Sequence, residues 1–376
     1  MRISGLCMFL LPALLCLNLQ AQRPPKAIRH VVVIGVDGMS PDGIHQANTP
    51  HMDRLMREGA WTLHARSVTP SSSSPNWASI IMGADVEQHG IHSNDYERDD
   101  YILPPVVRGN ADIFPTIFGE IHQQMPRAEI GAIYEWGGFG RLFEKEAVDY
   151  NQRASSEAAA AQLASDYIVA KRPTFCFVHL DHVDHAGHIA GHGTAKYYRS
   201  VERADSLIGQ ILEAIVRAGI ADETLVLICA DHGGKGHGHG GLTMAEMEVP
   251  LILYGPGVKK GYELPIPVFQ YDHAATVAFA LGVEAPMPGL AGHRAAPSKV
   301  LKCPPATMRW PLYSKGRSFF MVKKATSPQA ACSGATPWCR SRTRSRAKSA
   351  IPSMAAPRDP GLRCTKKPFP SASRRW

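Results

Sequence analysis

The sequence predicts an α/β fold in which a mostly parallel sheet carries helices on both faces. Strand-like and helix-like segments alternate along most of the chain, which is the pattern of such a sheet. Acidic residues follow three of the apolar runs, at the points where strands of this fold meet their ligands. A hydrophobic content of 44% and a charged content of 20% are ordinary for a globular protein, and 376 residues suffice for one large α/β domain or two smaller ones.

Short runs rich in β-branched and aliphatic residues predict the strands. They are Val31–Val36, Glu129–Tyr134, Phe175–Leu180, Thr224–Ala230 and Pro250–Tyr254. The first run is almost entirely β-branched, so we expect a strand that is buried on both faces.

Amphipathic spacing, together with residues that start or stop a helix, predicts the helices. They are Pro50–Glu58, a helix opening at Ser74 and Pro75, Phe114–Gln123, an alanine-rich helix that Ser155 or Ser156 caps and that runs to Lys171, a long helix from Tyr198 that Gly219 closes, and Tyr271–Leu281.

The N-terminus has the features of a secretory signal peptide over residues 1–21. Arg2 precedes a short apolar run, Leu6–Leu17, and Ala21 ends a plausible cleavage site. We therefore expect an exported protein, periplasmic or secreted, with no membrane span, because no later apolar run is long enough to cross a bilayer. A lipid anchor at Cys16 is the alternative. Cys176 and Cys229 fall within predicted strands, where we expect buried thiols.

The charge divides the chain into an acidic body, residues 22–288, and a basic, low-complexity tail, residues 289–376. Before residue 289 there are 22 basic and 32 acidic residues (−10); after it there are 19 basic residues and a single acid, Asp359 (+18). An acidic body argues against nucleic acid as a partner of the body. Two interpretations of the tail stay open: a disordered basic segment, or a change of reading frame near Gly289.

Aspartate and histidine gather where three predicted strands end. Asp37 closes the first run, Asp184 and His188 follow Phe175–Leu180, and the pair Asp231 and His232 follows Thr224–Ala230. A further histidine, His239, comes after the third run, where His237 competes with it. The carboxyl ends of parallel strands lie together, and carboxylate with imidazole suits one or two divalent metals. Four more histidines crowd the same segments and are better explained as supporting residues: His179, His182, His185 and His192.

Ser73 and Asn94 are the candidates for chemistry on an anionic substrate. Ser73 precedes a predicted helix, and helix N-terminal amides attract anions, so a metal could activate this serine as a nucleophile. Asn94 offers an amide donor for a phosphate or sulfate oxygen. The plainer interpretations are a capped loop for Ser73 and a turn residue for Asn94.

Five motifs in order resemble the alkaline phosphatase superfamily, and its type I phosphodiesterase/nucleotide pyrophosphatase branch in particular. They are VIGVDGM, SSSPNWASIIMG with HGIHSND, DHVDHAGH, ADHGG and GHGG, and they span about residues 28–281. The segment YEWGGFGRLFEK is also similar to the middle region of this branch.

The resemblance implies two divalent metal ions, Zn²⁺, and hydrolysis of a small phosphorylated substrate through a phosphoseryl intermediate on Ser73. One ion would be held by Asp37, Ser73, Asp231 and His232, and the other by Asp184, His188 and His239; Asn94 would bind a substrate oxygen. His239 is preferred to His237 because GHGG lies at the distance from ADHGG that the family shows.

Two departures bear on the substrate. The nucleotide pyrophosphatases usually carry threonine where this chain has Ser73, and sulfatases place an arginine where this chain has Trp77. Hydrolysis of phosphoric esters is therefore the leading hypothesis. Hydrolysis of sulfate or phosphonate esters on the same scaffold is one alternative, and a catalytically inactive metal- or phosphate-binding protein is another.

Overall fold

The computed structural model describes residues 28–99 and 101–284. These residues belong to the first of two compact units of the chain, residues 1–312. The predicted signal peptide, residues 1–21, and the basic tail, residues 289–376, lie outside the described residues. Within the described part, no helix is both long enough and apolar enough to cross a membrane.

An eight-stranded sheet forms the centre of the described unit. Its strands lie in the order β4 (Tyr150–Arg153), β3 (Ile130–Tyr134), β5 (Phe175–Leu180), β1 (His30–Val36), β6 (Thr224–Cys229), β7 (Glu248–Tyr254), β2 (Ala60–Arg66) and β8 (Tyr262–Glu263). Of these strands only β7 runs against the others. The predicted mostly parallel α/β sheet is thus confirmed.

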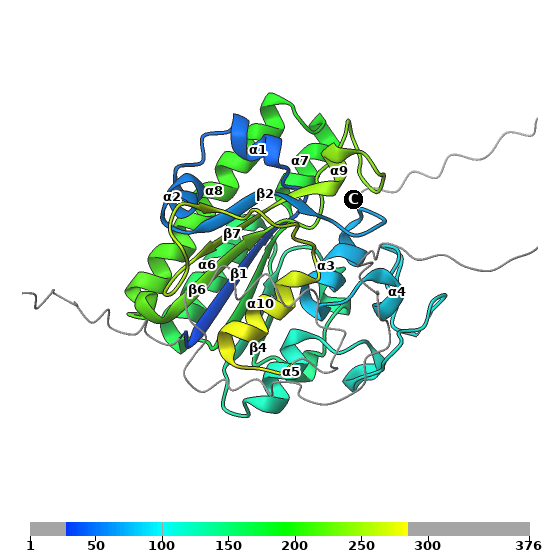
Figure 1. Cartoon of the computed structure of the whole chain (residues 1–376), viewed down its shortest axis with the longest axis vertical. Coiled ribbons are helices and arrows are strands. Elements are labelled where there is room, and N and C mark those ends of the chain that lie inside the picture. The colour runs from blue at the N-terminus through cyan, green and yellow to red at the C-terminus, as the bar shows by residue number, and fades with distance from the viewer. Residues whose placement is uncertain (1–27, 100, 285–376) are drawn as a thin grey trace, which may run out of the picture. The chain divides into compact units, whose positions relative to one another are not determined.

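Two groups of helices cover the two faces of the sheet (Figure 1). One group packs around α8 (Ala195–Arg217) and contains α1 (Pro41–Gln46), α2 (Pro50–Glu58), α6 (Glu157–Lys171) and α7 (His182–Ala190). The other contains α3 (Ser73–Met82), α4 (Val86–His89), α5 (Ile117–Gln124) and α10 (Asp272–Leu281). The short helices are α9 (Met244–Met247) and four 3₁₀ turns at Asn110–Asp112, Phe139–Arg141, Lys145–Ala147 and Ala221–Glu223.

Strand β1 sets the position of the site because it lies between β5 and β6. Gly35 pairs with His179 on one side and with Cys229 on the other, so all three strands end at the same edge. The apolar residues of β1 are buried, as expected for a strand that is covered on both faces. Cys176 and Cys229 are buried free thiols, as predicted.

Four helix starts differ from the predictions, and that of α10, at Asp272, differs by one residue. Helix α3 begins at Ser73 rather than after it, and Ser72 is its N-cap. Helix α5 begins at Ile117, three residues after the predicted start, because the Thr116 side chain caps it by accepting hydrogen bonds from the amides of Phe118 and Gly119. Helix α8 begins three residues early, where Thr194 caps it through the amide of Tyr197.

The sequence analysis missed several elements, and one of them carries site residues. The segment with Asp184 and His188, for which no helix or strand was predicted, forms helix α7. The two residues are four positions apart, so they lie on one face of that helix. Strands β2 and β4 were also missed, although β2 alternates partly between buried and accessible residues.

Candidate metal centre

The predicted metal ligands converge at the carboxyl edge of the sheet. Asp37 directly follows β1, Asp231 lies two residues after β6, and Asp184 occupies the first turn of α7 beyond β5. Gly38 makes this approach possible, because a Cβ on that residue would lie only 2.7 Å from the Cβ of Asp184. Gly38 has a φ of +68°, and its amide donates to Asp231 Oδ1 at 3.1 Å.

His232 lies at the centre of the first group of ligand atoms. Its Nε2 is 3.4 Å from Asp37 Oδ1, 3.2 Å from Asp231 Oδ2 and 3.3 Å from Ser73 Oγ. The ligand atoms of Asp37, Asp184 and His232 all lie within 4.8 Å of one another, and all three residues are buried. Ser73 is 5% exposed, so its hydroxyl reaches this group from the first turn of α3.

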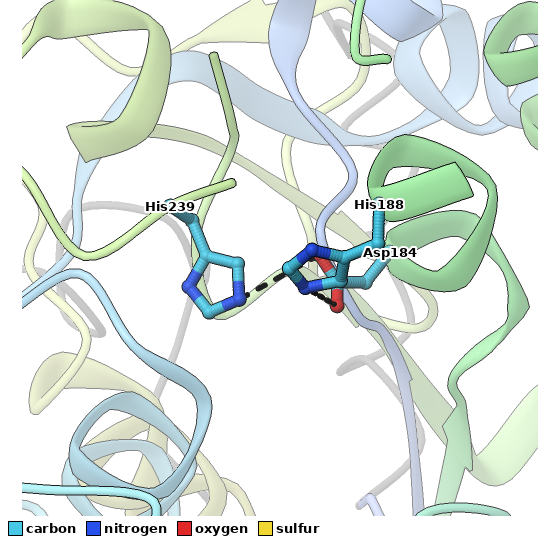
Figure 2. A group of neighbouring side chains, drawn as sticks. All are labelled: Asp184, His188 and His239. Atoms are coloured by element: carbon cyan, nitrogen blue, oxygen red, sulfur yellow. Dashed lines mark ion pairs between the residues drawn. The ribbon is translucent and has the colours of Figure 1, made fainter. Parts of the chain in front are cut away.

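Asp184, His188 and His239 form a second group, also within 4.8 Å. His188 Nε2 lies 3.0 Å from Asp184 Oδ2, and His239 Nε2 lies 3.9 Å from Asp184 Oδ1. Figure 2 shows Asp184 and His188 extending from α7 while His239 approaches from the facing loop. The His239 ring stacks on the ring of His232 at 3.7 Å, which joins the two groups.

Backbone carbonyls fix the orientation of all three imidazoles. Nδ1 of His188 lies 2.9 Å from the carbonyl oxygen of His237. Nδ1 of His232 lies 2.7 Å from the carbonyl oxygen of Gly233, and Nδ1 of His239 lies 3.2 Å from that of Ser71. A carbonyl oxygen can only accept, so Nδ1 carries the proton and Nε2 presents its lone pair to the centre. This is how metal-ligating histidines are held.

The donor set fits divalent cations. Asp37 Oδ1, Asp184 Oδ1 and Asp231 Oδ2 are buried and have no hydrogen-bond partner within the described residues. Burial, followed by the neighbouring Asp231, raises the pKa of Asp37 well above its usual range, and burial followed by Asp37 raises the pKa of Asp184 to about 7. Buried carboxylates facing imidazole lone pairs lack a positive charge, which one or two divalent metals supply.

Asn94 joins the site through the helix that carries Ser73. Its Oδ1 accepts a hydrogen bond of 2.7 Å from the backbone amide of Ser74. The amide nitrogen of Asn94 therefore keeps both of its N–H donors for another acceptor near the N-terminus of α3. A substrate oxygen at this helix terminus also meets backbone N–H groups.

The structure separates His239 from its competitor His237. His237 is exposed, and its Nδ1 faces the carbonyl oxygen of His188 at 3.0 Å. Neither group of converging ligand atoms includes His237, whereas His239 belongs to the second group. His237 therefore supports the loop, and its own carbonyl orients His188.

Residues around Asp37 were given no specific role by the sequence analysis. Trp77 Nε1 donates to Asp37 Oδ2 at 3.0 Å, and His179 Nε2 lies 3.2 Å from the same oxygen. Asp181 forms a third group of converging atoms with Asp37 and His179. His179 was expected only as a supporting residue, and the signal for it is that it is the one charged or strongly polar side chain in the otherwise apolar β5.

The segment YEWGGFGRLFEK braces the loop that carries Asn94. Arg141 Nη2 donates to the carbonyl oxygen of Asn94 at 2.9 Å, and its Nη1 pairs with Glu97. In return, Arg98 Nε donates to the carbonyl oxygen of Arg141 at 2.9 Å. Glu135, at the start of this segment, accepts from the amide of Asp181 at 3.0 Å.

A family model and curated relatives match this chain. The model described as type I phosphodiesterase / nucleotide pyrophosphatase matches residues 31–237. The rat ectonucleotide pyrophosphatase/phosphodiesterase family member 3 is 23% identical over 54% of this chain and 24% of its own length. The human bis(5'-adenosyl)-triphosphatase ENPP4 is 24% identical over 56% of this chain and 48% of its own length. The chain thus spans about half or less of the length of these relatives.

Sulfatases also match, over a shorter stretch or at lower identity. Arylsulfatase K of zebrafish (Danio rerio) is 34% identical over 27% of this chain and 20% of its own length. Among solved structures, murine ectonucleotide pyrophosphatase / phosphodiesterase 5 gives a TM-score of 0.58 at 15% identity, covering 69% of this chain and 96% of that one. A 2-O GAG sulfatase gives a TM-score of 0.57 at 15% identity, covering 71% of this chain and 72% of that one. At these identities the structures establish a shared alkaline phosphatase-like fold.

Proposed function

The chain belongs to the type I phosphodiesterase/nucleotide pyrophosphatase family, and from this premise we propose that it is an exported, metal-dependent hydrolase of phosphoric esters. The observation that supports the proposal most directly is the position of the Ser73 hydroxyl. It lies 3.3 Å from His232 Nε2, beside two buried carboxylates, in the first turn of a buried helix. A phosphoryl group placed there meets a nucleophile and helix amides together.

Two divalent cations, Zn²⁺ in our proposal, have suitable ligands in this centre. Asp37, Ser73, Asp231 and His232 are the ligands for one, and Asp184, His188 and His239 those for the other. When bound, a pair of such ions supplies positive charge that lowers the pKa of a coordinated hydroxyl and stabilises both apical oxygens of an in-line displacement.

The protein's own groups act on the phosphoryl centre in the following order. The Ser73 oxygen attacks phosphorus in line with the leaving oxygen and forms a phosphoseryl intermediate. The leaving oxygen departs on the side where Asp184 and His188 lie. Water then attacks from the vacated side and releases Ser73. The free N–H groups of Asn94 and the amides of α3 stabilise the charge on the equatorial oxygens.

A substrate panel tests this proposal. We expect the purified protein with zinc to hydrolyse p-nitrophenyl phosphate or bis-p-nitrophenyl phosphate, and Ser73→Ala to lose turnover while it keeps its zinc. Ser72→Ala is the matched control, because Ser72 is the N-cap of α3 but its side chain makes no capping hydrogen bond. Near-normal activity of Ser73→Ala would exclude Ser73 as the nucleophile.

Sulfate-ester hydrolysis is the second candidate, and the similarity to arylsulfatase K favours it. We expect phosphate esters to react faster, because a dinuclear centre suits a phosphoryl group that carries up to two negative charges. Rates on p-nitrophenyl sulfate and p-nitrophenyl phosphate, measured on one enzyme preparation, decide between them. Faster turnover of the sulfate would reverse the assignment.

A further inference from the structure

His192 is a buried imidazole whose ring makes no hydrogen bond to any described residue. Its side chain is 3% exposed, and both Nδ1 and Nε2 lack a partner. A neutral imidazole has one N–H donor and one acceptor nitrogen, and burying either without a partner is unfavourable. Such a residue needs an explanation beyond packing.

The surrounding backbone is shaped to hold this ring. A Cβ on Gly187 would come within 2.3 Å of the His192 ring, and a Cβ on Gly234 within 2.2 Å. The two glycines therefore leave a slot that the ring fills. The backbone amide of His192 is also held, because it donates to the carbonyl oxygen of Gly236 at 2.7 Å.

The ring is directed at one of the predicted metal ligands. His192 Nε2 lies 3.8 Å from Asp184 Oδ1, and that oxygen likewise has no hydrogen-bond partner in the described part of the chain. The separation exceeds a hydrogen bond by less than about 1 Å. Two buried, complementary atoms without partners thus face each other at the centre.

The geometry favours a positioning role over direct coordination. The ligand atoms that converge on the second position are those of Asp184, His188 and His239, and His192 is not among them. Asp184 has its Oδ2 beside His188, and its Oδ1 lies at a similar distance from His192 and from His239. A donor on one lone pair of Oδ1 would therefore fix the rotation of the carboxylate and leave Oδ2 and the second lone pair of Oδ1 for the cation.

We infer that His192 is a positioning residue whose Nε2, 3.8 Å from Asp184 Oδ1 in this structure, closes to a hydrogen bond with that oxygen when a cation is bound and thereby sets the affinity of the second cation position. The inference rests on the proposed function, because it presumes that Asp184 binds a cation. Outer hydrogen bonds of this kind alter metal affinity by about 10- to 100-fold.

A pair of amide substitutions tests the inference. In His192→Gln the side-chain amide reaches the place of Nε2, whereas in His192→Asn it reaches only the place of Nδ1. We expect zinc titration against a competing chelator to show a 10- to 100-fold weaker second site in His192→Asn, with the first site unchanged. His192→Gln should retain most of the affinity of the original protein.

His89→Asn is the matched control for the loss of a buried imidazole. His89 is fully buried and bonds to Ser79 Oγ and the amide of Ile91, away from the metal ligands. The variant His89→Asn should lower the thermal stability of the metal-free protein and leave both zinc affinities unchanged. Comparison with metal-free His192→Asn and His192→Gln separates a folding defect from a loss of metal affinity.

Equal zinc affinities in His192→Asn and the original protein would overturn the inference, as would an equal loss in His192→Gln and His192→Asn. Neither result affects the proposed function if the original protein binds two zinc ions and hydrolyses phosphate esters. If the original protein binds no zinc, the proposed function fails first, and the inference fails with it.

Discussion

Asp184→Asn should stabilise the metal-free protein at pH 8, although it removes a predicted metal ligand. Burial, and then the nearby Asp37 carboxylate, raises the pKa of Asp184 from 3.8 to about 7. The folded state therefore holds the proton more tightly than the unfolded state does. The associated stability is fully present below pH 3.8, the unfolded pKa, and is lost as the pH rises through about 7. Asparagine keeps the shape of the side chain without the charge, so the variant avoids this loss.

The expected size follows from the shift of about three pKa units. At 1.36 kcal/mol per unit, ionising Asp184 in the folded state lowers the free energy of unfolding by about 4 kcal/mol at pH 8. At pH 5 the same relation gives a decrease of only about 2 kcal/mol in the free energy of unfolding, because the folded carboxyl is still protonated there. The advantage of Asp184→Asn over the original protein should therefore grow by about 2 kcal/mol between pH 5 and pH 8.

Urea unfolding in the presence of EDTA, at pH 5 and at pH 8, measures this difference directly. The difference between the two proteins is the informative quantity, because burial lowers the pKa of His192 to about 4 and of His239 to about 3. Those imidazoles make both proteins less stable at low pH, and their contribution cancels. In excess zinc the order should reverse, since only the original protein binds the second ion fully. If the stability advantage of Asp184→Asn over the original protein in EDTA were the same at both pH values, the reasoning would be refuted.

The remaining predictions concern the ligands and the Asn94 loop. His239→Asn should lose one zinc ion per chain while His237→Asn keeps both, as metal analysis after dialysis will show; equal contents would contradict the assignment. Asn94→Ala should lower kcat by about 10² to 10³, the usual effect of removing an oxyanion donor, with zinc content unchanged. Arg141→Met should lower kcat by about 10-fold, because the guanidinium pairs with Glu97 and contacts Asn94 through its backbone carbonyl and not through its side chain. An Arg141→Met loss as large as that of Asn94→Ala would instead indicate that Arg141 contacts the substrate.

The sheet could be predicted because its signals are local. The strands β1, β5 and β6 are mostly apolar runs that fall where the sequence places them, within one residue at each end. The antiparallel direction of β7 could not be predicted, because direction depends on pairing with β6 and β2 and not on the strand's own composition. Helix α7 was missed for a similar reason. The segment HVDHAGHIA contains one glycine and three histidines, most of its residues are weak helix formers, and packing against α8 sustains it.

The aspartates and histidines that converge could be predicted from strand ends, but the residues that contact them could not. His179 and Trp77 both contact Asp37 Oδ2, although they lie 142 and 40 residues away in the sequence. Arg141 reaches the Asn94 carbonyl across 47 residues. Contacts of this kind depend on the three-dimensional approach of loops, for which a single sequence carries no pattern.

The choice between His237 and His239 shows most clearly what only the structure contains. Both residues lie in the same glycine-rich run, so composition treats them alike. In the fold, the Nδ1 of His239 meets the carbonyl oxygen of Ser71, just before the helix that carries Ser73, while the Nδ1 of His237 meets the carbonyl oxygen of His188. The first contact turns the His239 Nε2 lone pair toward Asp184, and the second points the His237 ring at the backbone of α7. Two backbone carbonyls far away in the sequence therefore decide which imidazole faces the cation position.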